Sequence, residues 1–306
     1  MNSLNFVVLG DASAAGELGK KGAVADITFY EKKLNDTIFS FIVPSGFPEK
    51  IQPLIQSVGL AEFAILNVGS IDKPLGEQIV ALDRMGMERG FVIANGFEDD
   101  VKKIIKSTVV ENYEFLTLEQ LKQRIVDIEP VSAEGPTKIL IDAAFEVKGV
   151  GTVALGVLRR GGLKKHDELE IFPVKKPVSV RSIQMHDDDV ENAVSPARVG
   201  VAIKGANAAD IARGDVIAVK DSTNVGSEIK INFEKNIFYR QELNSASSYH
   251  LCIGLQIKPV KIEIKGSEMT AISSKPFAYD AGERCLLVDL NSESMRIVGR
   301  GRVERT

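Results

Sequence analysis

Residues 144–173 read AFEVKGVGTVALGVLRRGGLKKHDELEIFP, and this stretch decides the fold of the middle of the chain. Apolar and polar residues alternate along it, as they do in strands that bury one side of a sheet. Gly149 and Gly151 allow a tight hairpin between two such strands, and Gly161-Gly162 allows the next one. Six short strands at this spacing predict a small closed β-barrel. They are Lys138–Val147, Thr152–Arg159, Glu168–Phe172, Pro177–Ile183, Val199–Ile203 and Asp215–Val219.

Segments of different composition flank this predicted barrel. Upstream, Glu129–Pro136 (EPVSAEGP) has the prolines, glycine and serine of a linker. Downstream, Asp221–Ser227 is a softer boundary before a second β-rich stretch. We therefore expect three domains, at residues 1–133, 134–221 and 222–306. In the last domain, alternation marks strands at Leu251–Ile257, Val260–Ile264, Cys285–Leu290 and Arg296–Val303.

Strand-like and helical patterns alternate in the first domain. This alternation implies right-handed crossovers and a doubly wound α/β sheet, whose ligands bind at the carboxyl ends of the strands. The predicted fold class is multidomain α/β plus all-β: a doubly wound sheet followed by two small barrels. The predicted strands of the sheet are Phe6–Leu9, Ile38–Val43, Phe63–Val68 and Phe91–Ala94. The predicted helices are Glu49–Val58, Pro74–Met85, Glu98–Ile105 and Leu118–Ile128.

The charge of the chain argues against a protein that coats nucleic acid through a general positive charge. The formal net charge is −4. Residues 1–133 hold 13 Lys+Arg against 19 Asp+Glu, residues 134–221 hold 13 of each, and residues 222–306 hold 12 against 10. An acidic first domain is an unfavourable environment for a polyphosphate, and the other two domains would meet RNA through local basic patches.

The cysteines, the histidines and the N-terminus carry no special signal. Cys252 and Cys285 lie in apolar runs without metal-ligand spacing, which is typical of buried thiols in a reducing cytoplasm. The three histidines are far apart in the sequence, so no metal site is predicted. The N-terminal run lacks a basic segment and predicts a first strand, not a signal peptide. No apolar run is long enough for a membrane span, and we expect a cytoplasmic protein.

The middle domain resembles the second domain of EF-Tu-type translation factors. The motif G-x-G-T-V at Gly149–Val153, followed by R-G-x-L-K and E-L-E-I strands, is similar to that domain. Four further motifs resemble the SelB branch of these factors, and the resemblance implies an archaeal SelB-like homologue. They are S-I-Q-x-H from Ser182, D-V-x-x-A from Asp189, R-V-G-x-x-x-K-G from Arg198 and D-I-x-R-G-D-V-I from Asp210. The C-terminal YHLCIGLQIKPVKIE and RIVGRGRV resemble the third domain of the same factors less specifically.

The resemblance implies a P-loop, G-x-x-x-x-G-K-S/T, after the first strand, but the sequence there is GDASAAGELGKKG. Gly10 aligns with the first glycine. Ala15-Gly16 stands in place of glycine and lysine, and Glu17 in place of the hydroxyl that binds Mg²⁺. Asp11 would repel phosphate, and Asp11 or Ser13 instead suits a helix N-cap.

The other two GTPase motifs are also altered. In place of D-x-x-G-H, the chain has Val43 for the aspartate and Phe47 for the histidine, while Gly46 remains. In place of N-K-x-D, it retains Asn95 and offers Glu98 as a longer carboxylate. Without the resemblance, Asn95 suits a turn that follows a strand, and Glu98 suits the first turn of a helix.

The resemblance implies that any nucleotide would bind through degenerate positions. These are Gly10, Asp11, Ser13, Gly46, Asn95 and Glu98. GTP and Mg²⁺ are the implied cofactors, and the lost charged groups argue against both, because phosphoryl transfer depends on charge neutralisation and water positioning. No catalytic residue is assigned.

In EF-Tu-like factors, a pocket on the second domain takes the aminoacyl-adenosine end of tRNA. By resemblance, its walls would include Asp142 and Phe145 from one strand and Gln184 and His186 from another segment. Without the resemblance, Phe145 reads as barrel core and His186 as a solvated loop residue. Arg300 and Arg302 share one face of the last strand and are candidates for contact with tRNA phosphates.

The preferred interpretation is a cytoplasmic SelB-like homologue that binds tRNA or a ribosomal partner after losing GTP hydrolysis, with neither DNA nor a membrane as a partner. Two alternatives stay open. One is an active but atypical translational GTPase that delivers aminoacyl-tRNA. The other is a non-enzymatic scaffold or regulator of translation.

Overall fold

The chain folds as two compact units in a computed structural model that describes residues 1–266 and 268–305. The first unit comprises Met1–Pro130 with Met295–Ile297, and the second comprises Val131–Ser294 with Val298–Thr306. The division at Pro130 falls inside the segment expected to be a linker. The first unit holds an α/β domain and the second holds two barrels.

A seven-stranded mixed sheet forms the centre of the first unit, in the order β2-β3-β4-β1-β5-β6-β7. Strand β1 pairs in parallel with β4 and β5, and β6 pairs in parallel with β5 and β7. The antiparallel pair β2 and β3 at one side of the sheet was not predicted, because β2 is exposed, β3 is mostly half-buried, and neither contains a long apolar run. The strands are β1 (Asn2–Gly10), β2 (Lys20–Lys21), β3 (Thr28–Leu34), β4 (Thr37–Val43), β5 (Phe63–Asn67), β6 (Gly90–Ile93) and β7 (Glu114–Phe115).

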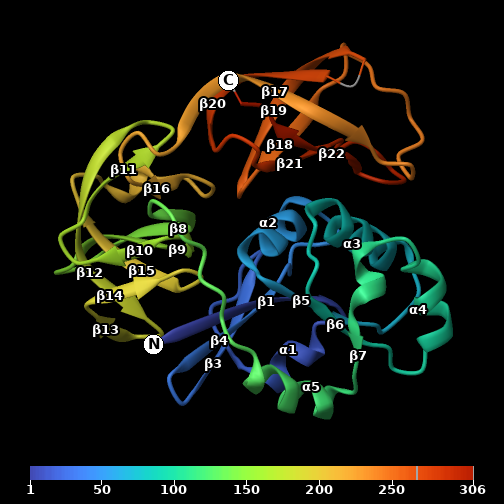
Figure 1. The fold of residues 1–306 in the computed structure, drawn as a ribbon, viewed down its shortest axis with the longest axis horizontal. Coiled ribbons are helices and arrows are strands. Elements are labelled where there is room, and N and C mark those ends of the chain that lie inside the picture. The colour runs from blue at the N-terminus through green and yellow to red at the C-terminus, as the bar shows by residue number, and fades with distance from the viewer. Residues whose placement is uncertain (267, 306) are drawn as a thin grey trace. The chain divides into compact units, whose positions relative to one another are not determined.

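Helices cover both faces of this sheet (Figure 1). Helices α1 and α5 lie on one face, where buried Ala15 and Leu121 join a core that includes the stacked rings of Phe6, Phe41 and Phe63. Helices α2 and α3 lie on the other face. The helices are α1 (Ser13–Leu18), α2 (Gln52–Leu60), α3 (Lys73–Met85), α4 (Glu98–Ile104) and α5 (Leu118–Arg124), with short 3₁₀ turns at Val109–Asn112 and Ile125–Asp127.

Local capping explains where two of these helices begin and end. The Asp72 carboxylate accepts the Leu75 N–H at the start of α3, and Gly86 ends that helix in the left-handed conformation. Thr117 and Gln120 form a capping box at the start of α5. Capping thus fixes α5 directly after β7, so that Leu118 lies near the carboxyl edge of the sheet.

The first barrel closes in the order β11-β16-β8-β9-β15-β12, through the pairing of β11 with β12. These six strands match the six that the sequence predicts. Three short strands are added: β13 extends from β12, and β10 pairs with β14. The strands are β8 (Lys138–Val147), β9 (Gly151–Arg160), β10 (Gly162–Lys164), β11 (Glu168–Phe172), β12 (Lys176–Met185), β13 (Asp188–Val190), β14 (Asn192–Val194), β15 (Arg198–Lys204) and β16 (Val216–Ala218).

The second barrel closes in the order β17-β20-β19-β18-β21-β22. The predicted strand Leu251–Ile257 is in fact two strands, because the chain reverses at Gly254, which has a φ of +56°. The predicted boundary Asp221–Ser227 already contains the start of β17. The strands are β17 (Asn224–Lys235), β18 (Tyr249–Ile253), β19 (Gln256–Lys265), β20 (Glu268–Tyr279), β21 (Arg284–Val288) and β22 (Ile297–Val303).

The two barrels contact one another within the second unit. A Cβ placed on Gly214, before β16, would lie 2.9 Å from the Gln256 Cα of β19, so glycine allows the close approach. The Lys138 ammonium of β8 bonds to Asp280 and Glu283 next to β21. Among the described residues, no helix is long and apolar enough to cross a membrane.

Candidate functional site

An open cavity of about 390 Å³ lies at the carboxyl edge of the first sheet, where ligands of such sheets bind. The ends of β1, β5 and β6 supply its floor, and α1 and the start of α5 supply its walls. Of the residues predicted to bind nucleotide, the structure brings Asp11, Ser13 and Asn95 together here. The cavity is lined by Asp11, Ser13, Ala14, Glu17, Asn67, Val68, Gly69, Ile93, Asn95, Phe97 and Leu118.

The connection from β1 to α1 is only two residues long, Asp11 and Ala12. Asp11 Oδ1 accepts the Ser13 N–H at 2.8 Å, so the aspartate acts as a helix cap although Ala12 occupies the N-cap position. Gly10 has a φ of +78°, and its N–H donates to Gln78 Oε1 at 3.0 Å. This connection has no room for the loop that wraps phosphates in a P-loop, because helix α1 begins where that loop would continue.

Asn95 holds the floor of the cavity in place. Its Nδ2 donates to Asn67 Oδ1 at 2.8 Å and to the Val68 carbonyl at 3.0 Å. Asn67 Nδ2 in turn donates to the Asp11 carbonyl at 2.8 Å. The amides of Asn95 and Asn67 therefore link the ends of three strands, as expected for a residue that orders its loop.

The remaining nucleotide-site candidates lie outside the cavity lining. Glu98 turns back to accept the Gly96 N–H at 3.4 Å, at the start of α4, and does not line the cavity. The Gly46 N–H donates to the Asp26 carbonyl in a turn after β4.

The residues of the cavity do not fit a magnesium-bound nucleoside triphosphate. No Lys, Arg or His lines it in the described part of the chain, and its charged side chains are the carboxylates of Asp11 and Glu17. No group of three or more His, Cys, Asp or Glu suited to a metal ion occurs among the described residues.

A second candidate site lies on the outer surface of the first barrel. The register of four neighbouring strands aligns Ala143, Leu155, Gly200 and Gln184 in one row across β8, β9, β15 and β12. Phe145 and Val153 form the next row on the same face, two residues further along β8 and β9. We call the surface formed by Ala143, Phe145, Val153, Leu155, Gly200 and Gln184 the Gly200 platform.

Gly200 lets neighbouring side chains pack close to the strand backbone in this platform. A Cβ at this position would lie 3.2 Å from Leu155 Cδ2 and 4.0 Å from both Gln184 Cβ and Val153 Cγ1. A side chain there would therefore press against Leu155 and change the packing of the platform.

Without the family resemblance, Phe145 would be interpreted as barrel core, and the structure shows otherwise. Its side chain is 43% exposed, because it points outward at the end of β8, where the strand extends beyond the core. Gln184 is also exposed, and its Nε2 donates to Asp189 Oδ1 at 3.0 Å. This bond fixes the amide, so that its Oε1 can accept a hydrogen bond from a ligand.

Asp142 and His186 are neighbours of the platform residues in the sequence: Asp142 precedes Ala143 on β8, and His186 follows β12. The Asp142 carboxylate is 6% exposed and binds the Arg198 guanidinium through two oxygens at 2.5 and 3.3 Å. It therefore stabilises the barrel beside the platform. His186 is half-buried with a φ of +49°, in the β12–β13 turn two residues beyond Gln184.

Comparison with known proteins identifies the family. The domain family "Elongation factor Tu domain 2" matches residues 151–218. An uncharacterized protein of Methanocaldococcus jannaschii is 33% identical over 99% of this chain and 100% of its own length. The selenocysteine-specific elongation factor of the same organism is 25% identical over 94% of this chain and 72% of its own length. The chain belongs to the SelB/EF-Tu family of translation factors.

Solved structures of the family share the fold of this SelB/EF-Tu homologue. Translation elongation factor SelB of Methanococcus maripaludis, in complex with the GTP analogue GPPNHP, has a TM-score of 0.85 at 22% identity. The similarity covers 100% of this chain and 79% of that one. A bacterial selenocysteine-specific elongation factor has a TM-score of 0.83 at 20% identity, covering 99% of this chain and 58% of that one.

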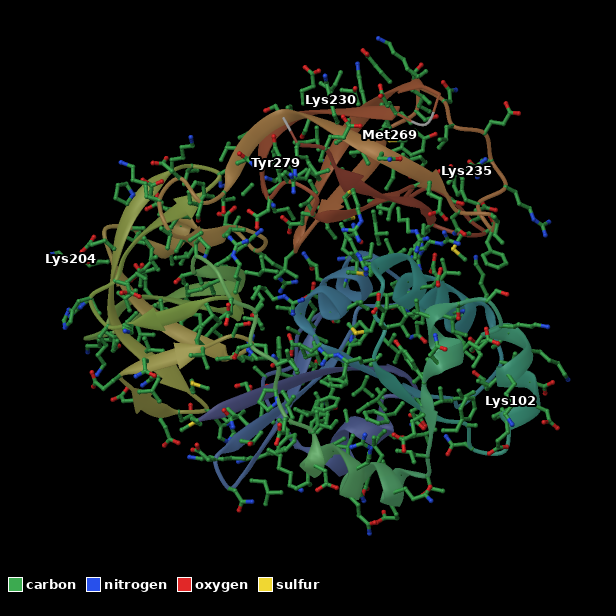
Figure 2. The ribbon with its side chains drawn as sticks, viewed as in Figure 1. Lys102, Lys204, Lys230, Lys235, Met269 and Tyr279 are labelled. Atoms are coloured by element: carbon green, nitrogen blue, oxygen red, sulfur yellow. The ribbon has the colours of Figure 1, made fainter. Side chains whose placement is uncertain are left out.

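The C-terminal arginines of this SelB/EF-Tu homologue lie on a surface of mixed charge. Arg300 Nε bonds to Glu234 Oε2 at 2.9 Å, and Arg302 donates to the Gly282 carbonyl at 3.0 Å. On neighbouring β17, exposed Lys230 (Figure 2) is two residues from exposed Glu228. The described residues around these arginines thus form no continuous basic patch.

Sequence reasoning missed the apolar half of the Gly200 platform in this homologue. Val153 and Leu155 were assigned to a strand but given no functional role, and Gly200 was noted only as the glycine of the R-V-G-x-x-x-K-G motif. Their period-two spacing with Phe145 contained the signal, because residues i and i+2 of a strand share a face. To place Gly200 on the same face also requires the register between β9 and β15, which pairs Gly200 with Leu155.

Proposed function

We propose that this chain is a cytoplasmic SelB-like factor that binds the aminoacyl end of tRNA on the Gly200 platform without a GTPase cycle. The observation that supports this most is the juxtaposition of a glycine, two half-buried aliphatic side chains and one fixed amide on the outside of the EF-Tu domain 2-like barrel.

The chemistry of the platform suits a nucleobase at a strand end. The half-buried side chains of Leu155 and Val153 offer an apolar surface to a flat ring. The Gln184 Oε1 accepts a hydrogen bond, which an exocyclic amine or a ribose hydroxyl can donate. Exposed Phe145 offers an aromatic surface for stacking, a contact worth about 1–3 kcal/mol per base.

The first unit supports the second part of the proposal, the loss of GTP hydrolysis. The two-residue connection between β1 and α1 and the carboxylates of Asp11 and Glu17 disfavour a triphosphate. In this proposal the first domain has a structural role and offers a folded surface to binding partners. The proposed binding partners are tRNA and the ribosome.

Filter binding to aminoacylated and deacylated tRNA across a salt series tests the proposal. We expect the chain to prefer the aminoacylated form, and Gly200→Leu and Gln184→Ala to remove this preference. Val174→Ala is the control, since Val174 is 58% exposed on the same barrel but lies outside the platform. Equal binding of both tRNA forms, or no binding at low salt, would overturn the proposal and favour an interaction scaffold.

A further inference from the structure

The cavity at the carboxyl edge of the first sheet presents only negative charge. Among the described residues that line it, Asp11 and Glu17 are ionisable, and both are acidic. The other walls combine the apolar residues Ala14, Val68, Ile93, Phe97 and Leu118 with Ser13, Asn67, Gly69 and Asn95. At about 390 Å³, the cavity lies in the lower part of the range for small-molecule sites.

Two oxygens that line the cavity are hydrogen-bond acceptors without a donor. Asp11 Oδ1 already accepts the Ser13 N–H, and Asp11 Oδ2 has no donor among the described residues. Both hydrogens of the Asn95 Nδ2 are used by Asn67 and Val68, which leaves the Asn95 Oδ1 as an acceptor. The Ser13 hydroxyl, which also lines the cavity, can donate or accept. A ligand that pairs with Asp11 Oδ2 and Asn95 Oδ1 therefore donates hydrogen bonds.

Glu17 contributes less to this negative charge than Asp11. Its Oε2 lies 3.3 Å from the Lys122 Nζ, which is also 2.9 Å from Glu119 Oε1. One ammonium is therefore shared between two exposed carboxylates, whereas no described cation pairs with Asp11. Asp11 is the main charge that a ligand in the cavity would meet.

We propose that this cavity binds a small organic cation, a protonated amine carried on an apolar or aromatic body. The ammonium group, which has donors and no acceptor, is directed at Asp11 and Asn95, where a charge-assisted hydrogen bond forms. The apolar body contacts Phe97 and Leu118 and is removed from water. The site thus selects a charge opposite to that of a phosphate.

Three probes of one shape and different charge test this assignment. They are 2-phenylethylammonium, 2-phenylethanol and phenylacetate, titrated into the ¹⁵N-labelled full chain. We expect the ammonium to shift the amides of Gly69 and Gly96 saturably, because Gly69 lines the cavity and Gly96 follows Asn95. The alcohol binds about tenfold more weakly, and phenylacetate produces no saturable shift.

Two variants separate a specific site from general attraction to an acidic domain. Asp11→Asn weakens ammonium binding about tenfold and leaves the alcohol unchanged. Asp99→Asn, an exposed carboxylate in the first turn of α4 and outside the cavity, leaves both unchanged. Saturation of the same amides by phenylacetate or GDP, equal ammonium binding in Asp11→Asn, or no saturation by any probe would each overturn the assignment.

Discussion

Lys138 Nζ lies 2.9 Å from Glu283 Oε2 and 3.1 Å from Asp280 Oδ2, so one buried ammonium on the first barrel binds two carboxylates of the second. The Lys138 side chain is 6% exposed, and both carboxylates are about one quarter exposed or less. Arg160 adds a bond to Asp280 at 2.9 Å. This cluster fixes the two barrels relative to one another within the second unit.

Replacing Lys138 with methionine should lower the free energy of unfolding by about 2–3 kcal/mol, because two carboxylates lose their buried partner. Urea unfolding followed by circular dichroism measures the change. Lys165→Met is the matched control, since Lys165 pairs with Glu191, which is 80% exposed. It should cost about 0–1 kcal/mol. Equal losses in the two variants would contradict a structural role for the Lys138 cluster.

Gly90 should be intolerant of a side chain. A Cβ there would lie 2.7 Å from the Ala64 carbonyl oxygen and would also overlap the ring of buried Tyr113. Gly90→Ala should destabilise the first unit by about 1–3 kcal/mol, measured from the urea midpoint. Gly76 on α3 has no atom near such a Cβ, and Gly76→Ala should stabilise by about 1 kcal/mol. A neutral Gly90→Ala would refute the close packing.

Glu146 should make the first barrel more stable at neutral than at acidic pH. Hydrogen bonds from the Ala208 N–H and the Thr152 hydroxyl, each to Oε1, hold the pKa of the Glu146 carboxyl below its ordinary value. A lowered folded-state pKa stabilises the fold above the unfolded-state pKa, and this contribution is lost as the pH falls through the folded-state pKa. Wild type should therefore exceed Glu146→Gln in urea midpoint at neutral pH and approach it in acid. A difference independent of pH would contradict this linkage.

Both cysteines should resist alkylation in the folded chain. Burial raises the pKa of Cys252 well above its ordinary value and that of Cys285 to about 12, and the thiolate is the reactive form. Iodoacetamide at neutral pH should label neither residue until denaturant is added, as measured by mass spectrometry. Rapid labelling of the native chain would show that the β18–β21 region opens in solution.

The fold followed from the sequence where the pattern is strongly periodic. All six strands of the first barrel were predicted, because glycine turns separate alternating runs. Strand β17 was missed since the soft boundary at Asp221–Ser227 concealed its start, and its outer face carries exposed charged residues such as Glu228 and Lys230. Strand β3, next to edge strand β2, was missed because most of its residues are only half-buried, which weakens the apolar signal.

The candidate sites were predicted only in part. Phe145 and Gln184 were named by resemblance, and the structure places both on one surface. Gly200 could not be assigned to that surface, since its role depends on the pairing of β15 with β9 and β12, a long-range relationship. In the first unit, the altered motif was visible in the sequence, but the two-residue length of the β1–α1 connection required the observed start of α1.

The most direct test of the central claim compares aminoacyl-tRNA binding with and without GTP, on one protein preparation with turnover assayed in parallel. We expect preferential binding of aminoacylated tRNA that is unchanged by GTP, abolished by Gly200→Leu, and accompanied by no phosphate release. Binding that requires GTP, together with release of phosphate stimulated by the tRNA, would contradict it.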